Sequence, residues 1–195
     1  MSLIIGLTGG IGSGKTTAAR MFETLGIPVF IADDEGKRQT GLSEIKKLII
    51  NVFGTEIITN DEIDRKKLAS IVFNNSLMLQ KLNDIIHPAV KKSFEQWCAA
   101  NINSKYVIYE SAILFETNFT TNFYKVITVS ASENIRIARV KARSNISENE
   151  VKDRISKQWT DTQREEKANY VIKNIDIENT KEQVYAIYTA LMKNN

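Results

Sequence analysis

The chain has 195 residues, of which 43% are hydrophobic and 25% charged, and its formal net charge is +3. This length suits one α/β domain with insertions, and this composition can form an apolar core. Basic and acidic residues are nearly balanced, which argues against a duplex-DNA binder but leaves room for a basic pocket that binds a small anion.

Cysteine content and hydropathy bear on the compartment. The single cysteine, Cys98, rules out an intrachain disulfide and fits a reducing compartment. The apolar start of the chain lacks a preceding basic segment, and no apolar run approaches the roughly 20 residues that span a bilayer. We therefore expect a soluble, cytoplasmic protein without a signal peptide.

The first strand and helix flank a phosphate-binding pattern. An apolar run at 3–7 precedes residues 9–16, which match G-x-x-x-x-G-K-[ST], and an amphipathic helix over 16–25 follows. Glycines let backbone N–H groups turn around an oxyanion, and the helix N-terminus adds its positive dipole end. Lys15 should reach the β- and γ-phosphates, and the Thr16 hydroxyl should help to hold Mg²⁺. We predict that ATP is bound by Gly10, Ile11, Gly12, Ser13, Gly14, Lys15, Thr16 and Thr17.

The second strand, predicted over 28–32, delivers two acidic residues to the same edge of the sheet. Gly26 ends the preceding helix and Pro28 opens the strand. Because parallel strands joined by a right-handed crossover end at one edge, Asp33 should lie near the γ-phosphate. A carboxylate there can accept the proton of an attacking hydroxyl, so we predict that Asp33 is the catalytic base. Capping of the next helix is the alternative for Asp33 and the favoured role for Asp34.

About seventy residues then separate Asp33 from the next strand, and they show only helical patterns. Connections in this architecture are usually about two to six residues, so we predict a helical insertion over about 35–103. Helices are expected over 43–53 and 77–98. For the second we expect either two helices or a sharp kink at His87–Pro88, because proline removes a helical donor and restricts the residue before it.

The third strand, at 106–109, ends at Glu110, where an acid could organise Mg²⁺ or be merely structural. The fourth strand, at 126–129, leads to a helix over 133–143 that carries Arg136, Arg139 and Arg143 on one face. A polyphosphate facing this stripe would relieve the repulsion among its cations. We predict that Arg139 is catalytic and that Arg143 binds ATP; a solvated basic face is the alternative.

A helix over 147–158, a strand at 170–172 and a helix over 179–192 complete the pattern. Continuous apolar strands separated by helices are typical of a doubly wound parallel sheet in an α/β fold. We predict a single domain over 1–195, with a core over about 1–34, 104–136 and 168–195 and a helical lid over about 137–167.

With these residues identified, the chain resembles the dephospho-CoA kinase family of P-loop kinases along nearly its whole length. The resemblance is carried by the P-loop and by ordered stretches at 64–68, 71–73, 87–88, 114–116, 139–143, 154–158 and 168–174. It implies ATP-dependent phosphorylation of the ribose 3′-hydroxyl of dephospho-CoA, the last step of coenzyme A synthesis. By resemblance, the insertion binds the acceptor through Arg65 and His87, Asp33 is the base, Arg139 and Arg143 belong to the lid, and Asn174 lies near the adenine.

Three positions depart from the family pattern. Ile31 replaces the first acid of D-A-D, Glu110 and Ala112 replace an acid and a proline, and Arg136 stands where glutamine is common. These changes affect supporting residues rather than the reaction type.

Other functions share parts of this pattern. The P-loop alone also fits a nucleoside, nucleotide or shikimate kinase, and an ATP-dependent switch or nucleic-acid module is disfavoured by the missing basic stripe and sensor motif. A GTPase is rejected because the D-x-x-G at 33–36 follows Thr16 by only seventeen residues and no N-K-x-D signature follows. The expected partners are ATP, Mg²⁺ and dephospho-CoA, without nucleic acid or membrane, for a monomer or small homo-oligomer.

Overall fold

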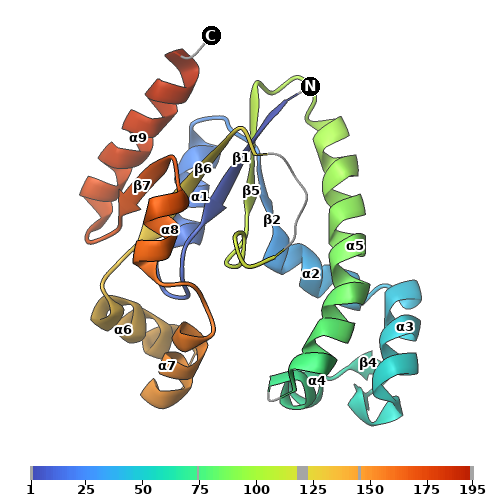
Figure 1. The fold of residues 1–195 in the computed structure, drawn as a ribbon. Helices are drawn as coiled ribbons and strands as arrows, with labels where there is room; N and C mark the ends of the chain where they lie inside the picture. The colour runs from blue at the N-terminus through green and yellow to red at the C-terminus, as the bar shows by residue number, and fades with distance from the viewer. Residues whose placement is uncertain (1, 74, 118–122, 145, 194–195) are drawn as a thin grey trace. The chain divides into compact units, whose positions relative to one another are not determined.

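The computed structural model describes residues 2–73, 75–117, 123–144 and 146–193. The chain forms two compact units: one comprises Met1–Ile31 and Asn101–Asn195, and the other comprises Ala32–Ala100. Within the described residues, no helix is long and apolar enough to cross a membrane. Each unit is described separately below (Figure 1).

The first unit is built on a parallel sheet, and all five predicted strands are confirmed. The strands follow the order β2-β5-β1-β6-β7, so β1 lies in the centre between β5 and β6. Their continuous apolar runs are explained by this placement, because a parallel sheet is covered on both faces. The strands are β1 (Leu3–Thr8), β2 (Val29–Ile31), β5 (Tyr106–Glu110), β6 (Lys125–Ser130) and β7 (Tyr170–Lys173).

The helices of this unit confirm the doubly wound α/β prediction. Helices α1 (Lys15–Thr24) and α9 (Ile177–Lys193) share one apolar core with the sheet, in which Phe22 and Leu191 are fully buried. Helices α6 (Glu133–Ser144) and α7 (Glu148–Ser156) pack together, and α8 (Asp161–Lys167) packs on β6 (Figure 1). The short α8 was not predicted, because two turns are too few for a helical period to show.

The second unit is mainly helical, as predicted, but it also contains a β-hairpin that the sequence analysis missed. Its elements are α2 (Ala32–Thr40), α3 (Ser43–Phe53), the 3₁₀ helix η1 (Thr55–Ile57), β3 (Ile58–Thr59), β4 (Glu62–Ile63), α4 (Arg65–Phe73) and α5 (Ser76–Ala100). Asn60 and Asp61 turn the hairpin with φ angles of 50° and 60°. Asparagine and aspartate tolerate this conformation, which a two-residue hairpin turn requires. Two-residue strands are too short to give an alternating pattern.

The prediction of two separate helices at Pro88 is wrong, because α5 (Ser76–Ala100) continues through this residue. Proline removes one helical hydrogen bond and costs about 3 kcal/mol in a helix interior. Tertiary packing offsets that cost: α5 contacts α2, α3 and α4, and its Leu82, Ile85 and Ile86 pack on the buried cluster around Ile49.

The only histidine of the chain, His87, makes stability in this unit depend on pH. Burial lowers the pKa of its imidazole, and the nearby Asp84 carboxylate offsets part of that effect. His87 therefore binds a proton more readily in the unfolded chain than in the folded one. The stability that comes from burying neutral His87 is present above the unfolded pKa of about 6.5, and it is lost as the pH falls toward the lower folded pKa. We expect the free energy of unfolding to decline from pH 7.5 to 5.5. Urea titrations should show less decline in His87→Gln, and an equal decline would contradict this assignment.

Candidate active site

The P-loop residues between β1 and α1 form a tight backbone turn. Gly9, Gly12 and Gly14 have φ angles of 151°, 78° and 97°, a region that favours glycine. The Ser13 N–H donates to the Gly10 carbonyl at 3.1 Å, which closes the turn. Helix α1 starts at Lys15, so its first free N–H groups lie at the end of the turn, as anion binding requires.

Packing from outside the loop also requires these glycines. A Cβ at Gly12 would lie 2.6 Å from the Arg136 carbonyl oxygen, and one at Gly14 would overlap the Asn174 side-chain amide. The sequence analysis assigned the glycines to close approach by phosphate. The structure adds that α6 and the end of β7 lie directly against the other side of the loop.

Lys15 lies beside a buried carboxylate. Its Nζ is 3.9 Å from Glu110 Oε1, and both side chains are at most 10% exposed. Glu110 ends β5, where the strand register pairs it with Leu7 on one side and Ile31 on the other. The carboxylate is therefore at the carboxyl edge of the sheet within reach of the P-loop lysine, while Thr16 and Thr17 are exposed in the first turn of α1.

The three arginines of α6 do not form the uniform stripe that the sequence analysis expected. Arg136 is 5% exposed, and its guanidinium binds the Ile11 carbonyl at 2.9 Å and Asp161 at 3.3 Å. Arg139 is half-buried and donates to the Ser13 carbonyl at 3.4 Å. Arg143 is exposed. One of the three cations is thus neutralised behind the loop, which leaves Arg139 and Arg143 as the candidates for phosphate contacts.

Asn174, which the resemblance places near the adenine, supports the P-loop with its side chain. Its Nδ2 donates to the Ser13 carbonyl at 2.8 Å, and its Oδ1 accepts from Thr180 at 3.1 Å and from Arg139 at 3.4 Å. Asn174 is 5% exposed, and these three hydrogen bonds tie its amide to the P-loop, α6 and α9. Its contact with adenine stays a prediction.

A buried ionic network stands behind the loop. Arg164 is fully buried and forms ion pairs with Glu116 at 3.2 Å and Asp161 at 3.3 Å, and Asp161 also pairs with Arg136. Burial lowers the pKa of Arg164, and the Glu116 and Asp161 carboxylates oppose that shift. Glu116 also accepts the Trp159 N–H at 3.0 Å. Two carboxylates thus balance two guanidinium groups in a largely water-excluded place.

This network predicts a large stability effect at Arg164. Replacing Arg164 with methionine removes the cation that both carboxylates share, and breaking a buried pair in this way costs about 3–5 kcal/mol. We expect the free energy of unfolding of Arg164→Met, measured in urea, to fall by that amount. Lys181→Met is the control, because Lys181 and Glu178 form an exposed pair on α9 worth less than about 1 kcal/mol. Equal losses in the two variants would show that the buried network adds no stability.

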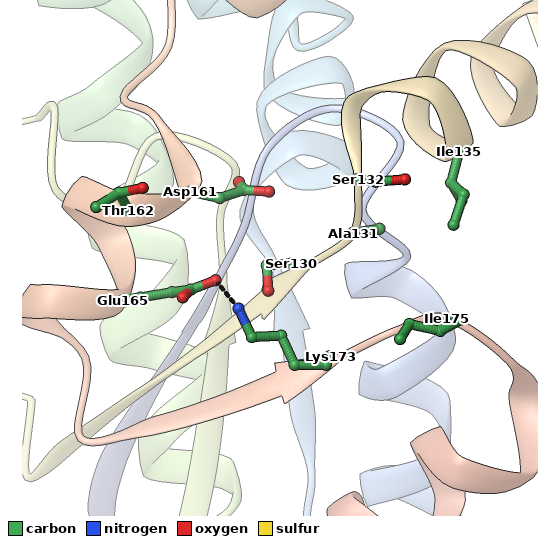
Figure 2. Close-up of a pocket in the computed structure, with 9 residues that line it drawn as sticks. All are labelled: Ser130, Ala131, Ser132, Ile135, Asp161, Thr162, Glu165, Lys173 and Ile175. Carbon is green, nitrogen blue, oxygen red and sulfur yellow. Dashed lines mark hydrogen bonds and ion pairs between the residues drawn. The ribbon is translucent and has the colours of Figure 1, made fainter.

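A cavity of about 420 Å³ lies where β6, β7, α6 and α8 meet. Figure 2 shows Lys173 and Glu165, which pair at 2.5 Å, beside Ser130, with Asp161 on the same wall. None of the predicted site residues lines it. The cavity gives solvent a route to Asp161, whose side chain is 23% exposed.

The predicted acceptor residues lie in the second unit on three different helices. Asp33 is exposed in the first turn of α2, one residue after its start, so it does not cap the helix. Asp34 pairs with Lys37 at 2.6 Å. Arg65 opens α4 and donates to the Lys37 carbonyl at 3.2 Å, and His87 is half-buried in α5. Their ligand roles stay predictions.

Comparison with known proteins places the chain in a family. The family model described as dephospho-CoA kinase matches residues 3–179. The chain belongs to the dephospho-CoA kinase family. A dephospho-CoA kinase from Geobacillus kaustophilus is 38% identical over 192 residues, covering 96% of each chain. A solved Thermus thermophilus structure matches with a TM-score of 0.88 at 28% identity over 100% and 98% of the two chains. The dephospho-CoA kinase structure from Campylobacter jejuni matches with a TM-score of 0.70 at 25% identity over all of both chains.

Two of the stretches that carry the dephospho-CoA kinase resemblance, both in the first unit, contact the P-loop or the ionic network behind it. Phe115 stacks on Trp159 with ring centroids 5.5 Å apart, and the adjacent Glu116 belongs to the buried ionic network. Gln158, the last residue of another stretch, accepts the Ile11 N–H at 2.9 Å. The sequence analysis quoted these stretches without a role. Asp161 and Arg164 were not predicted, because nothing in a single sequence shows that Asp161 pairs with Arg136, 25 residues away, or Arg164 with Glu116, 48 residues away.

Proposed function

We propose that this protein transfers the γ-phosphoryl group of ATP to the ribose 3′-hydroxyl of dephospho-CoA to give coenzyme A. The observation that carries the proposal is the glycine-lined turn that ends at Lys15, beside Glu110, in a chain of the dephospho-CoA kinase family. A turn of backbone N–H groups followed by a helix N-terminus binds polyphosphate, and a kinase acts mainly by positioning and neutralising it.

ATP would lie along the P-loop, with N–H groups of the turn and of α1 around its phosphates; the N–H groups of Ile11 and Ser13 donate instead to Gln158 and to the Gly10 carbonyl. Lys15 would contact the β- and γ-phosphates, and Arg139 and Arg143 would neutralise charge that develops during transfer. Arg139 is half-buried and Arg143 is exposed on α6. Arg136, the third arginine of this helix, already donates a hydrogen bond to the P-loop.

Magnesium is the metal that this site would use. Mg²⁺ prefers oxygen ligands and usually takes only one or two from the protein, the rest coming from phosphate and water. The exposed Thr16 hydroxyl and the Glu110 carboxylate at the sheet edge supply oxygens of that kind. Bound there, the ion would neutralise the β- and γ-phosphate oxygens.

The second unit would receive dephospho-CoA. Asp33 is the second residue of α2, which begins directly after β2, and it would accept the proton of the 3′-hydroxyl. Arg65 would provide a cation for the acceptor phosphates, and His87 would be a further contact. Because ATP is the phosphoryl donor, we place the enzyme in the cytoplasm, as a monomer or small homo-oligomer.

One assay tests the reaction. The protein is incubated with Mg-ATP and dephospho-CoA, and the acceptor is weighed by mass spectrometry while ADP is measured. We expect a gain of about 80 Da, one phosphoryl group, on dephospho-CoA. Coenzyme A is the matched control acceptor, because its 3′-hydroxyl is already phosphorylated. A gain on shikimate or a nucleoside alone, or ADP release without a phosphorylated acceptor, would overturn the proposal.

A further inference from the structure

The N–H, the carbonyl and the side chain of Ile11, a residue of the P-loop, all contact residues that are distant in sequence. Its N–H donates to Gln158 Oε1 at 2.9 Å, and its carbonyl accepts from Arg136 Nε at 2.9 Å. Its side chain packs on the apolar cluster of α6 and α7 that includes Val140 and Val151. The two hydrogen bonds fix the peptide units on both sides of Ile11.

Arg136 is itself oriented by charge. Its Nη1 donates to Asp161 at 3.3 Å, and Asp161 also pairs with fully buried Arg164. Asp161 therefore lies between two guanidinium groups, and its pair with Arg136 holds that arginine against the loop. The guanidinium group of Arg136 is planar and rigid. Its ion pair with Asp161 therefore fixes the direction in which its Nε donates to the Ile11 carbonyl.

We propose that Arg136 and Gln158 are positioning residues for phosphoryl transfer, which clamp the two peptide units around Ile11 and so hold the P-loop in its phosphate-binding shape. The clamp rests on the proposed function of this loop. Phosphate binding needs the N–H groups that face the anion to point inward already, because each peptide unit that must first rotate weakens the site. The Ile11 N–H, which donates to Gln158, is not one of these groups but fixes the backbone that leads into them. The clamp also joins α6 and the end of α7 to the loop, so elements of the predicted lid hold the phosphate cradle from behind.

The test compares variants that remove the two hydrogen bonds to Ile11. Arg136→Met matches only the apolar stem of arginine and donates nothing, so it also loses the ion pair with Asp161. Gln158→Leu keeps the shape of the side chain but accepts nothing. Gln158→Glu retains the acceptor and should rescue the loss. Arg20→Met, on the exposed face of α1, and Gln80→Leu, on the exposed face of α5, are matched controls.

We expect Arg136→Met and Gln158→Leu each to lower kcat about 10- to 100-fold, the effect of a small misplacement of reacting groups, with the KM for dephospho-CoA nearly unchanged. Calorimetry should show ADP affinity reduced about fivefold, as for one lost hydrogen bond. Gln158→Glu and both controls should stay near the wild type.

A purely structural role would give a different result. If Arg136→Met and Gln158→Leu lower only the melting temperature, while kcat at 25 °C and ADP affinity match the wild type, the clamp is overturned. The ADP measurement also separates the two proposals. Wild-type protein that fails to phosphorylate dephospho-CoA refutes the proposed function, whereas unchanged ADP affinity in both variants refutes the clamp.

Discussion

Asp33→Asn is expected to lower kcat about 10²- to 10⁴-fold while ATP binding survives, the usual range for a lost general base. Asparagine has the size of aspartate but cannot accept the proton of the ribose hydroxyl. The ion pair of Lys15 and the hydrogen bonds of Arg136 and Arg139 to the P-loop are made within the first unit, and Asp33 takes part in none of them. Single-turnover measurements with saturating ATP isolate the phosphoryl-transfer step from product release.

The next residue provides the control for Asp33→Asn. Asp34 has the same side chain in the same helical turn, but it forms an exposed pair with Lys37. Asp34→Asn should keep near-normal turnover. Both changes remove a negative charge from the start of α2, where it favours the helix by about 0.3–1 kcal/mol, so both should lower stability similarly. Near-normal turnover of Asp33→Asn, or equal loss of turnover in both variants, would remove Asp33 from the role of base.

The main features of the fold could be predicted from sequence because they rest on local patterns. Five apolar runs gave the five parallel strands, and the helix over 43–53 has the predicted ends. The glycine spacing before Lys15 predicted a turn whose φ angles only glycine adopts easily. Periodicity and turn chemistry are properties of neighbouring residues, so a single sequence contains them.

The errors have the opposite cause. Helix α5 continues through Pro88 because three other helices pack against it, and packing between distant segments is not visible in a local pattern. The hairpin turned by Asn60 and Asp61 is too short to leave a pattern at all.

Around the P-loop, too, contacts between residues distant in sequence could not be predicted. Arg136 was predicted to share a face with Arg139 and Arg143, and helical geometry does place it there. Its burial depends on Asp161, which is twenty-five residues away and reaches it only through the packing of α8. In sequence, an arginine that pairs with a carboxylate, such as Arg136, cannot be told from one that is free to bind phosphate. Only the tertiary structure distinguishes the two.

Lys15→Met should abolish most activity, because it removes the one cation that the loop itself offers to the β- and γ-phosphates. Removing one preorganised donor to transition-state charge costs about 10²- to 10³-fold in kcat. Methionine matches the length of the lysine stem, so the packing of the stem is largely kept. The loss should appear in kcat as well as in ATP affinity, because charge on the transferred group grows toward the transition state.

The neighbouring carboxylate makes the experiment sharper. Lys15 Nζ lies 3.9 Å from Glu110, so Lys15→Met also places the buried carboxylate next to an apolar side chain. A second variant, Lys15→Met with Glu110→Gln, removes that electrostatic cost. We expect the double variant to recover much of any lost stability in urea but none of the lost turnover. If turnover returns with stability, Lys15 acts by keeping the sheet edge folded, and if Lys15→Met alone keeps normal kinetics, the loop does not bind the transferred phosphate.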